Sequence, residues 1–208
     1  MTIRPYRPHD ADALYDVCLR TGAAGEDASR SFSDPHLLGS VYVGPYLALE
    51  PGLAFVLDDG DGAQGYVLGA RDTTAFALAQ ERVWWPVLRS RYPEGTFAAG
   101  TADAGIVTLL HHPHVAEPTV VRTYPSHLHI DLLPRWQGAG WGRRLMTRAL
   151  TALAETGSPG VHLEVSASNG RAIGFYRRMG FVEIEPRAAG VTMGRRLEPA
   201  GDPVSAET

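Results

Sequence analysis

The sequence lacks several features that mark whole classes of protein. Its single cysteine, Cys18, excludes an internal disulfide bond and leads us to expect a reducing, cytoplasmic location. We find no secretory signal pattern at the start of the chain and no apolar run of membrane-spanning length. The formal net charge is −4, with no basic stripe of the kind that binds nucleic acid. We therefore expect no nucleic-acid partner and no membrane partner.

The length and composition fit one enzyme-sized domain. With 208 residues and 44% hydrophobic side chains, the chain is able to bury a substantial core without disulfides or metal ions. We predict a single domain over residues 1–196, with an insertion at residues 71–125. The segment 197–208 is rich in proline, alanine, glycine and acidic residues, so we expect a flexible tail there.

Hydrophobic patterns predict a mixture of strands and helices before residue 127. In the insertion we expect a helix at 76–92 that Pro86 interrupts, and an extra strand at 106–110. Exposed apolar surface on this insertion would support a homodimer. Ahead of the insertion the expected elements are a strand at 3–7, a helix capped by Asp10 or Asp12, a helical region at 35–47, and a hairpin with strands at 54–57 and 65–70.

A glycine-rich turn is the clearest functional motif. Residues 127–144 read HLHIDLLPRWQGAGWGRR, which predicts an apolar strand, Pro134, a turn and then a helix over residues 142–154. The first N–H groups of that helix and its positive end suit a phosphate group. The spacing fits neither a dinucleotide fingerprint nor a nucleotide P-loop. A flexible turn without a ligand is the alternative.

A second motif follows about thirty residues later. Residues 161–184 read VHLEVSASNGRAIGFYRRMGFVEI, in which alternating apolar residues predict a short strand. Ser168 or Asn169 is expected to cap the next helix. Gly180 is placed to end that helix, and a further extended run follows it. The inward stripe of the helix consists of Ala172, Ile173 and Tyr176.

The two motifs together resemble those of the GNAT family of N-acetyltransferases. The first is similar to the family's Q/R-x-x-G-x-G/A turn, and the second to its N-x-x-A-x-x-F-Y-x-x-x-G-F segment. The resemblance implies an α/β (α+β) fold with a mixed, mostly antiparallel central sheet and helices on both faces. It also implies a splay between the fourth and fifth strands, here 127–133 and 161–165. Acetyl-CoA, as cosubstrate, would occupy that gap.

The resemblance also implies roles for individual residues. A backbone amide near Leu132 or Leu133 would polarise the acetyl carbonyl, and residues 137–143 would hold the pyrophosphate. Tyr176 would protonate the departing thiolate, and its alternative role is that of a core aromatic residue. The implied coenzyme-binding residues are Leu132, Leu133, Gln137, Gly138, Ala139, Gly140, Trp141, Gly142, Arg143, Asn169, Ala172, Phe175 and Tyr176.

An amine acceptor must lose a proton before it attacks the acetyl group. A lysine-like amine has a pKa of about 10.4, so a base or a desolvating pocket is needed. His127, His129 and Asp131 alternate along the predicted strand and share one of its faces. Asp131 or His129 would act as the base, directly or through a water molecule. The alternative is a structural network in which Asp131 orients a histidine.

Three longer segments narrow the resemblance. Residues 3–22, 43–51 and 123–134 are similar to the acetyltransferase-like domain of eukaryotic O-GlcNAcase and its free-standing bacterial relatives. The animal domain has lost the glycine turn and is regarded as a pseudo-acetyltransferase, whereas this chain keeps its glycines. Two functions follow. One is acetyl transfer to a small-molecule amine or to a protein lysine or N-terminus, and the other is an inactive coenzyme-binding or recognition module.

Two further kinds of chemistry are weighed against acetyl transfer. The histidines of the His111–His114 segment, together with His127, His129 and Asp131, offer possible metal ligands. No HExxH spacing occurs, however, and a metal hydrolase would leave both motifs unexplained, so we predict no metal. The resemblance does not imply glycosidase activity either, because the hydrolase of O-GlcNAcase is a separate domain. The neighbouring Asp58 and Asp59 lie in a predicted hairpin turn, which favours a structural role for them.

Overall fold

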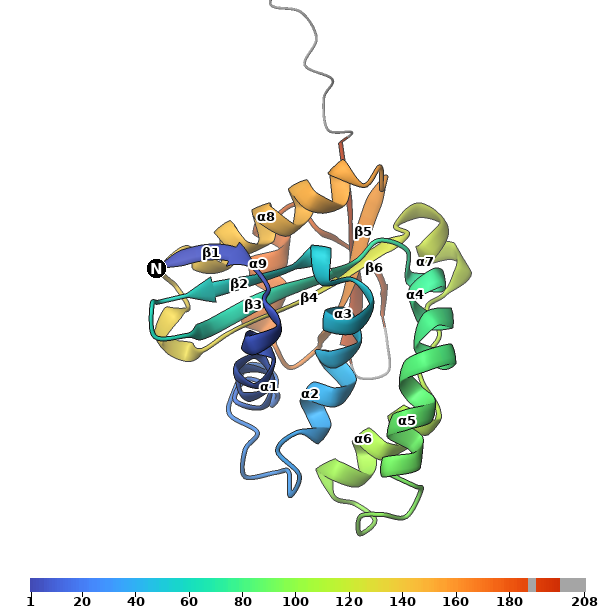
Figure 1. The fold of residues 1–208 in the computed structure, drawn as a ribbon. Coiled ribbons are helices and arrows are strands. Elements are labelled where there is room, and N and C mark those ends of the chain that lie inside the picture. Colours follow the sequence, from blue (N-terminus) through green and yellow to red (C-terminus); the bar gives the residue numbers. More distant parts are fainter. Residues whose placement is uncertain (187–189, 199–208) are drawn as a thin grey trace, which may run out of the picture.

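Residues 1–186 and 190–198 are described by a computed structural model built around one seven-stranded sheet (Figure 1). Its strand order is β1-β2-β3-β4-β5-β7-β6. All neighbouring strands pair antiparallel except β4 and β5, which are parallel, so the predicted mixed sheet is confirmed. The strands are β1 Thr2–Pro5, β2 Ala54–Asp58, β3 Ala63–Ala70, β4 Ser126–Leu132, β5 Gly160–Ser166, β6 Val182–Pro186 and β7 Gly190–Arg196.

The parallel pair opens soon after it begins. Only Ser126 with Val161 and His127 with His162 are in register between β4 and β5. Beyond them the two strands separate, which confirms the predicted splay. The backbone groups of β4 and β5 that would pair in a regular sheet therefore face a gap.

Helices cover both faces of the sheet, as predicted. On one face, α8 (Trp141–Glu155) buries Leu145 and Leu153 against strand residues such as Phe55, and α9 (Gly170–Arg178) joins the same cluster. Burial of such a leucine contributes about 1.5–3 kcal/mol. On the other face lie α1 (Ala11–Leu19), α2 (Leu37–Tyr42) and α3 (Gly44–Leu49), which pack on residues such as Tyr66. The predicted helical region at 35–47 is thus two short helices.

The insertion forms a helical layer beside α2. Leu37 and Val41 of α2 pack on Trp85 and Leu88, which places the insertion against the α2 side of the domain. Its elements are α4 (Thr73–Ala79), a π-helical turn η3 (Gln80–Trp84), α5 (Trp85–Arg91), α6 (Ala102–His111) and α7 (Pro118–Thr123). Three short 3-10 turns complete the fold, at Pro8–Asp10, Pro51–Leu53 and Pro134–Trp136.

Two local predictions in these regions differ from the structure. The strand expected at 106–110 is wrong, because this run lies within α6, where Val107 and Leu110 face the insertion core. Thr101 caps α6 by accepting from the Ala104 N–H, a signal that outweighs the β-branched residues. The expected helix interruption near Pro86 is confirmed and takes the form of the π turn just before it.

The cap expected at the start of α1 is also wrong. The helix begins after Asp10, but neither Asp10 nor Asp12 caps it with a side chain. Asp10 instead forms an ion pair with Arg4 at 2.7 Å, and the hydrogen bond from Arg4 lowers the pKa of Asp10. Arg4 also bonds Asp58 at 2.6 Å, so Asp58 ties β1 to the hairpin and has a structural role.

Two further expectations concern the C-terminal tail and membrane-spanning helices. From residue 199 onward, the predicted tail of residues 197–208 lies outside the described residues. Within residues 1–186 and 190–198, none of the helices is both long enough and apolar enough to cross a membrane.

Candidate functional site

The glycine turn lies between the end of β4 and the start of α8. Gly138 and Gly140 have φ values of 79° and 84°, in the left-handed region that favours glycine. Gly140 directly precedes α8, and Ala139 is exposed between the two glycines. The Gln137 side chain donates from Nε2 to the Leu132 carbonyl at 2.7 Å, so it ties the turn to the strand end.

Gly142 differs from the other two glycines in having no positive φ and in facing another helix. A Cβ atom added there would lie 3.6 Å from the Phe175 ring, an ordinary contact distance, so Gly142 packs against α9 without being required there by space. Asn169 begins α9 by accepting from the Ala172 N–H at 3.0 Å, which confirms one of the two predicted caps. Trp141 opens α8, with the Arg144 guanidinium over its ring. These predicted coenzyme residues therefore lie at the starts of α8 and α9.

A hollow lined by arginines lies between α8, the end of α9 and β7. It has a volume of about 420 Å³ and receives Arg143 from the first turn of α8, Arg178 from α9 and Arg195 from β7. Arg195 donates to the Met179 carbonyl, which fixes its side chain. Of these three arginines, only Arg143 was predicted. Three guanidinium groups around one hollow favour an anion.

The register of β4 decides which strand-end amide faces the gap. Leu133 donates its N–H to the Gln64 carbonyl at 3.0 Å, toward β3. Hydrogen-bonding direction alternates along an antiparallel strand, so the backbone of Leu132 points away from β3 toward the gap. The bond from Gln137 to the Leu132 carbonyl agrees with that direction. Leu132, rather than Leu133, therefore presents an amide to the gap.

Tyr176 lies in the core cluster beside the gap. Its ring packs between Phe175 and Phe181, with centroid distances of 5.4 and 5.8 Å. Burial raises the pKa of its phenol above the usual 10, and the charge of Asp131 adds to the shift. Every fully buried side-chain nitrogen or oxygen among the described residues has a hydrogen-bond partner. Among the described residues the Tyr176 hydroxyl has no assigned hydrogen-bond partner, and the raised pKa keeps it protonated at neutral pH.

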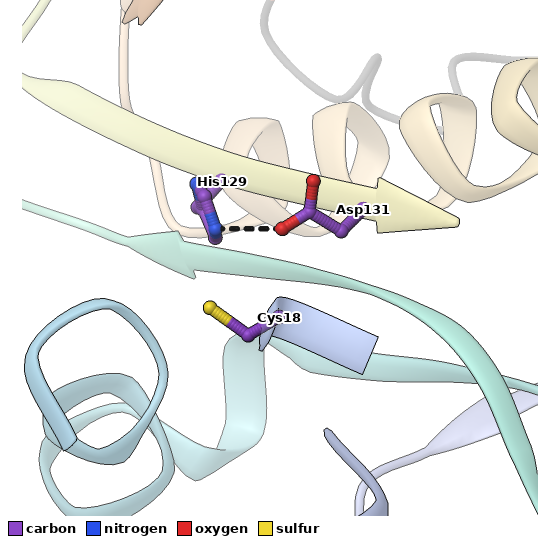
Figure 2. Close-up of side chains that lie close together, drawn as sticks. All are labelled: Cys18, His129 and Asp131. Carbon is purple, nitrogen blue, oxygen red and sulfur yellow. Dashed lines mark ion pairs between the residues drawn. The ribbon is translucent and has the colours of Figure 1, made fainter. Parts of the chain in front are cut away.

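On the other face of β4, His129 and Asp131 lie in one polar network (Figure 2). His129 Nε2 is 3.0 Å from Asp131 Oδ2, and the Tyr66 hydroxyl donates to the same oxygen at 2.6 Å. Figure 2 shows Cys18 of α1 directing its sulfur toward the pair. The structure thus brings together both predicted acid–base residues and adds Tyr66, which the sequence pattern marked only as part of an apolar strand.

The network sets the charge of His129. Burial alone would lower the pKa of this histidine, but Asp131 outweighs that effect through its charge and its hydrogen bond and raises the pKa to about 10. His129 is therefore an imidazolium at neutral pH, with Nε2–H donated to Asp131. An imidazolium has no lone pair with which to accept a proton.

His127 has the opposite protonation state. The Thr73 hydroxyl donates to the Pro125 carbonyl, so its oxygen must accept from His127 Nδ1, 2.8 Å away. Burial lowers the pKa of His127 to about 3. The ring is therefore neutral at physiological pH, with its proton on Nδ1 and a lone pair on Nε2.

Cys18, His129 and Asp131 also form the one group of possible metal ligands in the described part of the chain. Their donor atoms lie within 4.8 Å of one another. The separations of 3.0 Å for His129 and 2.6 Å for Tyr66 from one Asp131 oxygen are those of hydrogen bonds. His111, which bonds the Tyr92 carbonyl in the insertion, is not part of the group. The absence of a metal stays a prediction.

The fold and the glycine turn define a coenzyme-dependent acetyltransferase architecture. The chain belongs to the Acetyltransferase (GNAT) family, whose profile matches residues 31–181. This finding confirms the resemblance drawn from the two motifs.

Particular relatives narrow the assignment. The chain is 30% identical to protein O-GlcNAcase of Rattus norvegicus over 185 residues, which is 88% of this chain and 20% of that protein. It is 34% identical to mycothiol acetyltransferase of Thermobifida fusca (strain YX) over 93 residues, covering 43% of this chain and 29% of that one. The chain thus spans about a fifth of O-GlcNAcase.

A solved structure, that of SsHAT, is similar along almost the whole chain. The TM-score is 0.89 at 46% identity, and the match covers 95% of this chain and 98% of that one. The likeness to O-GlcNAcase and to SsHAT supports the narrower resemblance as well as the fold.

Proposed function

We propose that the protein binds acetyl-CoA in the gap between β4 and β5 and transfers its acetyl group to an amine. One observation carries the proposal. Left-handed Gly138 and Gly140 stand at the start of α8, beside the opening where β4 and β5 separate. Amides and a positive helix end at such a place suit the pyrophosphate. The arginine-lined hollow beside Arg143 supports binding of a further phosphate group of the coenzyme.

Each step of acetyl transfer has a candidate group. The coenzyme supplies the activated acetyl thioester. The Leu132 amide donates to the carbonyl oxygen and stabilises the negative charge that develops there. The amine nitrogen bonds to the acetyl carbon, the carbon–sulfur bond breaks, and Tyr176 gives its proton to the thiolate. Burial raises the pKa of this phenol, so Tyr176 carries its proton at neutral pH.

The proton of the incoming ammonium group requires a base. His129 is an imidazolium, so we assign the role to Asp131, acting through a water molecule. Oδ2 of Asp131 is taken by Tyr66 and His129, which leaves Oδ1 as the oxygen for that water. His129 then acts by holding Asp131 in place and by its own charge.

Calorimetry with acetyl-CoA tests the proposed function. We expect binding by the unmodified protein and at least tenfold weaker binding by Gly140→Val, because a β-branched residue is strained at positive φ and fills open space beside the turn. Gly105→Val in α6 is the matched control, since Gly105 also faces open space but has no positive φ. Absence of binding by the unmodified protein would contradict the proposal. Binding without turnover on any amine would favour the recognition module.

A further inference from the structure

Tyr66 lies directly opposite Asp131, the residue to which we assign the base. The two residues are register partners between β3 and β4, so their side chains lie on the same face of the sheet. The Tyr66 hydroxyl donates to Oδ2 of Asp131 at 2.6 Å, a distance typical of a hydrogen bond to a carboxylate. A tyrosine of one interior strand therefore binds the carboxylate of the next strand, which borders the gap.

The Tyr66 hydroxyl is fixed as a donor to Asp131. Burial raises the pKa of the Tyr66 phenol well above its usual 10, and the charge of Asp131 adds to the shift, so the hydroxyl keeps its hydrogen. That hydrogen is given to Asp131, so the Tyr66 oxygen is left to accept. His129 Nε2 lies 3.1 Å from this oxygen and is protonated, so it is placed to donate there.

Tyr66 and His129 differ in how firmly they are held. The Tyr66 side chain is fully buried in the apolar cluster that joins α1 to β2 and β3. The His129 side chain is 31% exposed and that of Asp131 is 19% exposed. Cys18 of α1 directs its sulfur toward the same pair (Figure 2). Because its ring cannot move within the core, Tyr66 holds the carboxylate more rigidly than His129 does.

The position of the Asp131 carboxylate matters because of its neighbours. Asp131 precedes Leu132, whose amide we assign to the acetyl carbonyl. Its charge also adds to the effect of burial in raising the pKa of Tyr176, the group that we assign to the thiolate. The carboxylate therefore lies close to the groups that act on the acetyl thioester. In such a site, a displacement of about 1 Å is enough to slow a reaction substantially.

We propose that Tyr66 is a positioning residue for acetyl transfer, whose hydroxyl holds Oδ2 of Asp131 so that Oδ1 is presented to the water molecule. The ammonium group of the acceptor gives its proton to this water, and the water gives one of its own to Oδ1. Tyr66 keeps its hydrogen throughout and does not touch the substrate. This inference rests on the proposed function and adds to it a residue that lies outside both sequence motifs.

Two kinds of amine test this role, because only one kind needs a base to become neutral. Benzylamine and methylamine are ammonium ions at neutral pH, whereas aniline and methoxyamine are unprotonated there. Tyr66→Phe keeps the buried ring and removes the donor. We expect it to lower kcat for the first two amines about tenfold and for the last two less than about threefold. The dissociation constant of acetyl-CoA should not change.

Two further variants show whether Tyr66 acts through Asp131. Asp131→Asn removes the base, so adding Tyr66→Phe to it should lower kcat no further. Tyr92→Phe is the matched control, because the Tyr92 hydroxyl bonds the carboxylate of Asp34 at 2.7 Å in another part of the molecule. It should keep kcat for every amine. An unchanged kcat in Tyr66→Phe, or an equal fall for both kinds of amine, would overturn the inference while acetyl transfer stands.

A second measurement tests the position of Asp131 without turnover. Binding of acetyl-CoA with no thiol release from any of the four amines would count against the proposed function. In that case, three-bond NMR couplings to Cγ of Asp131 still report its χ1 angle. We expect one rotamer in the unmodified protein and in Tyr92→Phe, and averaging between rotamers in Tyr66→Phe. A single rotamer in Tyr66→Phe would overturn the inference.

Discussion

His127 and His129 share one face of β4, yet their neighbours give them opposite charges. The Thr73 hydroxyl donates to the Pro125 carbonyl and so accepts from His127, which places the His127 proton on Nδ1, and burial keeps the ring neutral. A carboxylate holds His129 as a cation. The alternation along the strand predicted that both side chains share a face with Asp131, but not these charges. The partners, Thr73 and Tyr66, come from distant parts of the sequence, so a local pattern has no information about them.

Tyr176 is the residue whose replacement separates catalysis from binding. Tyr176→Phe removes the proton proposed for the thiolate while leaving the ring in its packing. We expect at least a tenfold fall in kcat, within the range of general acid catalysis, with the dissociation constant of acetyl-CoA near that of the unmodified protein. Stopped assays of thiol release and calorimetry measure the two quantities.

Tyr92→Phe provides the matched control for this substitution. Tyr92 is a buried tyrosine of the insertion, and its hydroxyl bonds Asp34 at 2.7 Å, far along the chain from the gap. Its replacement should leave kcat unchanged. If Tyr176→Phe retained full turnover, Tyr176 would be a core aromatic residue only.

At the scale of elements, the sequence predicted those whose ends carry chemical signals. The turn before α8 and the cap and final glycine of α9 were all marked by glycine or asparagine, and the structure has them in those roles. The strand predicted at 106–110 failed because periodicity over five residues does not distinguish a strand from one side of a helix. Its true partners, Leu37 and Trp85, belong to α2 and α5.

The sequence also predicted exposed apolar surface on the insertion. Leu78, Val83 and Val87 are exposed apolar residues along α4, η3 and α5, consistent with the apolar surface expected there. Whether this surface joins two copies of the chain is untested, and the homodimer stays a prediction.

The arginine-lined hollow predicts a charge-dependent contribution from the end of α9. Replacing Arg178 with glutamine should weaken acetyl-CoA binding about three- to tenfold at low ionic strength, and the difference should shrink as salt is added because exposed charges are screened. Arg82→Gln, at an exposed arginine of the π turn, should bind like the unmodified protein. Equal affinities for all three proteins at every salt concentration would remove the hollow from the coenzyme site.

For the whole molecule, the two histidines shape the dependence of stability on pH. Between pH 3 and 6.5, His127 is protonated in the unfolded chain but neutral in the folded protein. The free energy of unfolding therefore falls as the pH falls. Between pH 6.5 and 10 folded His129 retains a proton that the unfolded chain loses, so stability falls as the pH rises. These two histidines together therefore favour a maximum near pH 6.5.

Chemical denaturation across this pH range measures the effect. His127→Gln should flatten the acid side of the profile and His129→Gln the alkaline side, whatever the absolute stability of each variant. His114→Gln should reproduce the unmodified profile. A profile of unchanged slope in either of the first two variants would contradict the charge assigned to that histidine.

The absence of one residue type simplifies assays of acetyl transfer. All 19 basic side chains counted as lysine or arginine are arginine, so the chain has no lysine. Acetylation of its own lysines therefore adds no background when peptide or protein acceptors are screened.

The gap between β4 and β5 has a consequence for how the protein avoids self-association. Beyond the first two residue pairs, β4 and β5 no longer pair with each other. Exposed strand edges of this kind recruit edges from other chains. Here the two edges belong to interior strands of one sheet and face each other, with α8 on one side and α1 to α3 on the other. The two separated edges thus lie inside one sheet and not at its outer edges, where a strand of another chain would add.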